Sequence, residues 1–183
     1  GHYKHAEIIG IALCSEPGTA SYIPMAHTGM ETVKQIEADV ALSILKPVLE
    51  DNTIFKTGHD LKTISHLLLA RGITLKGRRY DTMLQSYVLN SVAHRHKLDK
   101  LASHYLELDK ATTEELLGKG RTKIPFAELE LDKAANWSAE NADFCFRLHQ
   151  VLDSKLKATG QLADVYRYFE IALLPVLTRM EEA

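Results

Sequence analysis

The start of the chain has the sequence pattern of β-strands, which limits the folds that the whole chain can adopt. Residues 7–14 (EIIGIALC) form an apolar run rich in Ile, Leu and Ala, which is typical of a buried strand. Glu16-Pro17-Gly18 is a turn signal, and residues 20–25 form a second short strand candidate. Together they predict a β-hairpin.

Apolar residues recur with helical spacing through most of the remaining chain. The spacing predicts helices over residues 36–49, 61–71, 82–89, 98–105, 128–156 and 162–182. Short strands are expected at residues 53–57 and at a segment ending with Arg79-Tyr80-Asp81. Strands come first and helices dominate later, so the class is α/β with a helix-rich second half.

Two of these helices carry more specific expectations. In the first, Pro47 should distort the last turns. Its apolar face, which we expect to pack inward, consists of Ile36, Val40, Ala41, Ile44, Leu45 and Val48. The long helix over 128–156 is expected to break near Asn136.

One stripe of the long helix contains a polar residue. Trp137, Asn141, Phe144, Leu148 and Leu152 recur at i, i+4, i+7, i+11 and i+15, which places them on one inward face. Asn141 therefore lies beside the single Trp of the chain. A polar side chain in that place needs a hydrogen-bond partner or a site to serve.

Composition narrows the functional classes. With 183 residues, 45% of them hydrophobic, the chain is long enough for one domain with a normal core. A net charge of -2 provides no global attraction to nucleic acid, so any such contact must come from local basic clusters. Cys14 and Cys145 lack CxxC spacing, which favours a reduced, cytoplasmic setting. No apolar run is long enough to cross a membrane, so no membrane partner is expected.

Several motifs in the middle of the chain carry a family likeness. They are residues 56–62 (KTGHDLK), 80–91 (YDTMLQSYVLNS), 95–99 (RHKLD), 118–120 (GKG) and 139–143 (AENAD). This set resembles the 3'-5' proofreading exonuclease domain of bacterial DNA polymerase I, the first domain of the Klenow fragment. The long YDTMLQSYVLNS motif is specific, whereas the short acidic motifs alone would be weak. The resemblance implies a ribonuclease-H-like, DEDD-type fold with a mixed sheet flanked by helices.

The resemblance also implies a domain organisation. Residues 1–158 would form the exonuclease-like domain, and residues 159–183 a linker and the first helix of a polymerase domain in the same chain. The family's first strand would lie upstream of His5 and is missing here. In this family that strand lies inside the sheet. We therefore expect exposed strand edges and apolar surface, unless residues before Gly1 or another segment fill the gap.

The motif positions depart from the family pattern. The family holds two divalent metal ions with four carboxylates, which activate a water and stabilise the leaving oxygen. Here Ile64 stands at the second-motif Asp, Asn141 at the third-motif Asp, and Trp137 at the Tyr one turn before it. The first-motif pattern Asp-x-Glu occurs nowhere in the sequence. We therefore expect no catalytic residue, no metal and no cofactor in this domain.

Three functions stay open. The first is a vestigial exonuclease domain that scaffolds a polymerase of DNA replication and repair and contacts DNA weakly or through that polymerase. The second is an active exonuclease that uses Mg²⁺, upstream carboxylates and Asp60 or Asp143. Asp60 is better explained as a helix cap, and Asp143 lies about 200° around the helix from Asn141. The third, a free-standing interaction domain, is disfavoured because residues 173–181 resemble the start of a polymerase domain.

Basic clusters are the candidate DNA contacts. They are Arg71, Lys76, Arg78 and Arg79; Arg95, Lys97 and Lys100; and Lys119, Arg121 and Lys123. Solvated surface is the plain alternative for all three. Lys119 and Arg121 are the best candidates, followed by Arg95, because Gly118 and Gly120 would allow phosphate to approach the backbone. His94 and His96 are interpreted as part of a surface loop rather than as a metal site.

Overall fold

The fold is described from a computed structural model, which describes residues 7–29, 34–90 and 96–182, with side chains up to residue 172. Its helices are α1 (Ala38–Leu49), α2 (Leu61–Leu69), α3 (Thr82–Leu89), α4 (Leu98–Leu101), α5 (Thr113–Leu117), α6 (Leu131–Ala158) and α7 (Gly160–Glu182). A π-helical turn, η2 (Ala102–Leu106), continues α4, and two 3-10 turns, η3 (Gly120–Thr122) and η4 (Phe126–Glu128), follow α5.

Four strands form two separate two-stranded sheets in the described part of the chain. Strands β1 (Gly10–Cys14) and β2 (Ala20–Pro24) pair antiparallel, which confirms the predicted hairpin. Strands β3 (Lys56–Gly58) and β4 (Arg79–Asp81) pair parallel. The predicted strand at 53–57 thus begins three residues later than expected.

The two sheets are separate within the described residues. Within the described residues, neither sheet pairs with the other, so each keeps an unpaired edge. Leu13 on β1 and Ile64 on α2 are 38% and 37% exposed, respectively. Open strand edges and exposed apolar side chains are thus both present in the described part of the chain, and the missing first strand stays a prediction from the sequence.

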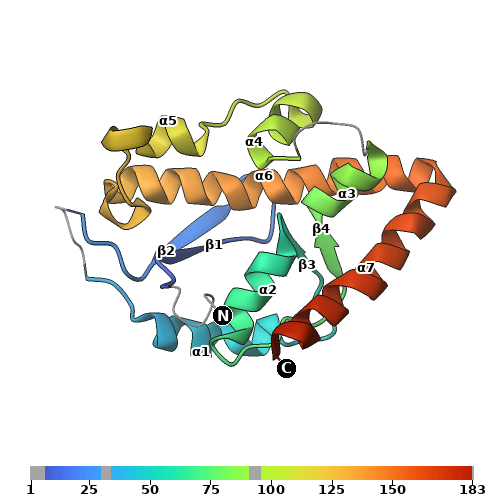
Figure 1. Ribbon diagram of the computed structural model, residues 1–183, viewed down its shortest axis with the longest axis horizontal. Helices are drawn as coiled ribbons and strands as arrows, with labels where there is room; N and C mark the ends of the chain where they lie inside the picture. The colour runs from blue at the N-terminus through green and yellow to red at the C-terminus, as the bar shows by residue number, and fades with distance from the viewer. Residues whose placement is uncertain (1–6, 30–33, 91–95, 183) are drawn as a thin grey trace.

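Helix α6 is the central helix of the fold. It crosses both sheets, with α4 and α5 on its other side, and α1 and α2 lie at the far side of the sheets (Figure 1). Helix α7 turns back from the end of α6 and packs against α2 and α3. The expected break near Asn136 is wrong, because α6 is continuous from Leu131 to Ala158. Asn136 is exposed there, and the packing of flanking Ala134 and Ser138 outweighs its weak helix propensity.

The predicted inner face of α1 is also wrong in part. Val40, Ile44 and Val48 are 47%, 65% and 49% exposed. Leu42 and Leu49 pack inward instead, in a core cluster with Leu61, Leu68, Ile73 and Leu75. The buried residues of this helix are Ala41, which belongs to the expected face, and Leu42, which lies beside it, so the face toward the core is rotated from the expected one. Pro47 lies inside the helix without ending it.

Helix α3 has a polar face that is fully inside the molecule. Its three buried polar side chains each hydrogen-bond a histidine ring from another segment. The pairs are Thr82 with His59 at 2.8 Å, Gln85 with His149 at 3.1 Å, and Ser86 with His96 at 2.7 Å. The helix spans the residues that the sequence predicted. Its buried side chains are polar, whereas Leu89 is partly buried against a core cluster of Leu101, Leu148 and Leu152.

This arrangement predicts a loss of stability in mild acid. Burial lowers the pKa of His59 and of His149 below their ordinary value of 6.5. The unfolded chain therefore takes up protons at a higher pH than the folded one. The stabilisation is complete above pH 6.5 and is lost as the pH falls through the folded pKa values, at about 1.4 kcal/mol per pKa unit of displacement.

Urea unfolding at pH 7.5 and at pH 5.5 measures this effect. We expect the His59→Gln/His149→Gln variant to lose less stability on acidification than the parent chain. His104→Gln, at an exposed position, is the matched control and should behave as the parent. Part of the pH dependence should persist in the double variant, because burial also lowers the pKa of His27. An unchanged pH dependence in the double variant would contradict the assignment.

Candidate functional site

The second-motif position carries no metal ligand. Ile64 lies on α2, and its Cδ1 is 3.2 Å from where a Cβ on Gly58 would be, so it packs against the end of β3. It is partly exposed rather than fully inside the core. A hydrocarbon side chain has no lone pair to offer a cation.

Asp60, one turn earlier, is occupied as a helix cap. Its carboxylate accepts hydrogen bonds from the Thr63 backbone N–H at 3.5 Å and the Thr63 hydroxyl at 2.9 Å. This confirms the predicted capping role. The residue has a φ of 65°, in the left-handed region that Asp tolerates better than most residues.

Asp81 joins the starts of two helices. Only 2% of the residue is exposed, and its carboxylate accepts from Asp60 and Leu61 N–H at 3.0 Å each and from Met83 N–H at 2.9 Å. Burial raises the pKa of Asp81, and the backbone donors act against that rise. The sequence indicated a helix start here, and the structure adds the cap of α2.

The third-motif position lies on the half-buried face of α6. Asn141 is one turn after Trp137, whose indole Nε1–H donates to the Ala111 carbonyl at 2.9 Å. The Trp137 ring also packs against Phe126, with centroids 6.1 Å apart. The indole is therefore hydrogen-bonded to the segment before α5. It has no hydroxyl with which to orient a water.

A lysine with a buried side chain, Lys110, lies beside Trp137, and no sequence pattern predicted it. The Lys110 ammonium donates to the Trp137 carbonyl at 3.0 Å and to Glu140 Oε1 at 3.4 Å. It also lies 4.3 Å from the centre of the Trp137 ring. Burial lowers the pKa of Lys110, and the Glu140 charge opposes that change. No local signal marked Lys110, because Asp109-Lys110 resembles an ordinary surface pair.

Asp143 is also occupied. Its Oδ1 accepts from the Gly18 N–H at 2.7 Å and from Arg147 Nε at 3.0 Å. The carboxylate thus fastens the β1–β2 turn to α6. Within residues 7–29, 34–90 and 96–182, no three His, Cys, Asp or Glu side chains are grouped so as to hold a metal ion. The side chains at the motif positions do not fit a divalent cation, which prefers several anionic or carbonyl oxygens.

The loop after α5 presents exposed cations. Lys119, Arg121 and Lys123 are all exposed, and Lys119 and Lys123 line a pocket of about 190 Å³. Gly118 has a φ of 92°, and a Cβ there would lie 2.7 Å from the Thr122 carbonyl oxygen, so the loop requires glycine. A Cβ on Gly120 would meet nothing within 4 Å, although its φ is 59°.

The other basic clusters differ from this loop. Arg95 and His94 lie outside the described residues. Arg78 pairs with Glu170 of α7 at 3.2 Å, and Arg79 donates to the Leu75 carbonyl at 3.5 Å. Those two guanidinium groups are used to hold the fold together. Among the helices of the described chain, none is long and apolar enough to span a membrane.

Comparison with known proteins identifies the family of this chain. A family model for a 3'-5' exonuclease matches residues 2–157. The chain is 39% identical over 180 residues to DNA polymerase I of Pseudomonas aeruginosa, covering 97% of this chain and 20% of that protein. It is 34% identical over 194 residues to DNA polymerase I of Rhizobium leguminosarum, covering 96% of this chain and 19% of that protein. The chain thus spans about a fifth of the length of these relatives.

Solved structures share the fold at low sequence identity. One described as the apo form of the nuclease has a TM-score of 0.70 and 17% identity, with 98% of this chain and 78% of that chain covered. Brucella melitensis NrnC bound to pGG has a TM-score of 0.61 and 19% identity, with 90% and 71% covered. These matches support the ribonuclease-H-like α/β assignment. The chain belongs to the 3'-5' exonuclease domain family of DNA polymerase I.

Proposed function

We propose that this chain is the exonuclease domain of a DNA polymerase I in which the domain no longer cuts DNA. It would act as a structural or DNA-contacting scaffold for the polymerase during replication and repair. The observation that carries the proposal is the loss of carboxylates at Ile64 and Asn141. The nearest replacements do not restore the site, because Asp60 caps α2 and Asp143 binds the Gly18 N–H and Arg147.

The decisive test is an exonuclease assay on the whole protein that carries this chain. It is incubated with 5'-labelled single-stranded DNA and Mg²⁺ or Mn²⁺. We expect the 3' end to shorten no faster than in a metal-free control, because without bound metal ions neither the water nor the leaving oxygen is activated. Metal-dependent shortening that Asp143→Ala abolishes would instead establish the alternative, an active exonuclease that uses upstream carboxylates.

DNA contact by the loop after α5 is the second part of the proposal. Its support is the exposure of Lys119 and Arg121 on a loop with glycines on either side of Lys119. Arg95 stays a candidate from the sequence alone. Each lost phosphate contact should reduce the salt dependence of single-strand binding, so Lys119→Ala/Arg121→Ala should reduce the slope of log K against log salt by ~1.4.

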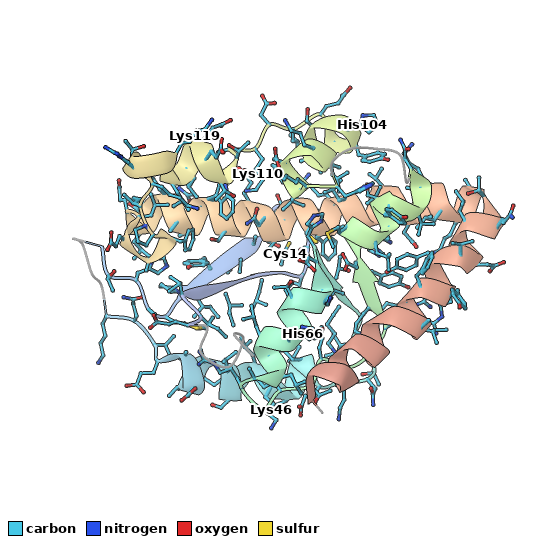
Figure 2. The ribbon with its side chains drawn as sticks, viewed as in Figure 1. Cys14, Lys46, His66, His104, Lys110 and Lys119 are labelled. Atoms are coloured by element: carbon cyan, nitrogen blue, oxygen red, sulfur yellow. The ribbon has the colours of Figure 1, made fainter. Side chains whose placement is uncertain are left out.

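Fluorescence anisotropy at several salt concentrations measures that slope. Lys46→Ala/Lys62→Ala is the matched control, because it removes the same charge from exposed positions on α1 and α2. Lys46 lies on the opposite side of the molecule from Lys119 (Figure 2). Equal slopes in the two double variants would assign the binding to net charge rather than to the loop.

A further inference from the structure

The Lys110 ammonium is a buried cation that lies beside the turn of α6 between Trp137 and Asn141. Its side chain is 2% exposed, although lysine is seldom buried without a partner. An ammonium has three N–H groups. The Trp137 carbonyl, Glu140 Oε1 and the face of the Trp137 ring provide three partners for them. These partners favour the charged form of the side chain, against the burial that lowers the pKa of Lys110.

This charge lies close to Asn141. Because α6 is a continuous α-helix, the Trp137 carbonyl also accepts the N–H of Asn141, four residues further on. Two nitrogens that share one acceptor oxygen lie within about 6 Å of each other. Helical side chains lean toward the N-terminus, so the Asn141 amide extends back toward the turn where Lys110 is bound.

We propose that Lys110 is a resident cation that takes the electrostatic place of a metal ion at this turn of α6. The inference rests on the proposed function and deepens it. A carboxylate restored at position 141 would pair with the Lys110 ammonium, and a divalent ion approaching it would meet a fixed positive charge. Charges in such a buried setting are weakly screened by salt. Neutral Asn141 and buried Lys110 form one matched arrangement that excludes metal.

The first test measures metal binding in the whole protein that carries this chain. Three forms of the Ile64→Asp/Asn141→Asp protein are compared: with Lys110, with Lys110→Arg and with Lys110→Met. Mn²⁺ affinity is measured by electron paramagnetic resonance of the free ion. We expect the Lys110→Met form to bind Mn²⁺ at least tenfold more tightly than the two forms that keep the charge. Equal affinities in all three, including no binding in any, would overturn the proposal.

The second test needs no metal. Asn141→Asp is introduced with Lys110 present and in the Lys110→Met background, and the thermal midpoints are compared. With Lys110 present the new carboxylate finds a partner, so the midpoint should be kept or raised. Without Lys110 it should fall, with a non-additive difference of about 3 °C or more. Additive changes would refute the coupling.

The two proposals fail in different ways. If Lys110→Met does not fold, Lys110→Gln takes its place in both tests, since the amide keeps hydrogen-bond donors while losing the charge. Metal-dependent cutting by the unmodified protein would refute the proposed function. Additivity of the Asn141 and Lys110 substitutions would refute the resident cation.

Discussion

Replacing Asp81 with Ala should lower the free energy of unfolding by about 3 kcal/mol. The carboxylate is almost fully buried and accepts from three backbone N–H groups, two at the start of α2 and one at the start of α3. Alanine would leave these donors without their acceptor. Part of the loss is offset because burying the carboxylate itself is unfavourable, which is why the pKa of Asp81 is raised.

Urea unfolding at pH 7 measures this effect, and a shift in midpoint without a change in m would report stability alone. Thr112→Ala is the matched control, because that half-buried residue caps one helix, α5, at an ordinary φ of -72°. Loss of its hydroxyl should cost about 1 kcal/mol. Equal losses at the two positions would contradict the double-capping role of Asp81. A gain in stability from Asp81→Asn would show that the burial penalty outweighs the hydrogen bonds.

A chain that ends at Ala158 should be less stable than one that ends at residue 172, by about 4 kcal/mol. The segment removed contains Tyr166 and Glu170, each 3% exposed. The Tyr166 hydroxyl accepts the Asp81 N–H at 2.9 Å and donates to the Arg79 carbonyl at 3.4 Å. Its ring stacks parallel to Tyr80, with centroids 6.5 Å apart. Truncation removes Tyr166, uncovers the face of the Tyr80 ring and leaves the Asp81 N–H of β4 without an acceptor.

Tyr166→Phe in the longer chain separates the two contributions. It keeps the buried ring and removes only the hydroxyl, so we expect a loss of about 1.5 kcal/mol in urea unfolding. The comparison also tests the boundary between residues 158 and 159, which stays a prediction from the sequence. Equal stability of the two truncated chains would support that boundary as an energetic one. The expected difference would instead make the first half of α7 part of the exonuclease domain.

Local patterns predicted the elements well, whereas packing decided which of their faces are buried. The hairpin and α3 were expected from apolar runs, turn residues and spacing, all of which act over a few residues. The inner face of α1 was not, because periodicity defines a stripe without saying what the stripe contacts. Helix α5 was missed altogether, since five residues are too few for a helical period.

The sequence by itself determined the family and the identity of the side chains at its motif positions. Ile64 and Asn141 lack the carboxylates of that family whatever their surroundings, because coordination depends first on the atoms a side chain possesses. Only the tertiary structure decided what surrounds them. It places Lys110 against Trp137, 27 residues away, and Tyr166 against Asp81, 85 residues away. Contacts over such separations depend on how whole helices pack, and no short pattern of residues encodes them.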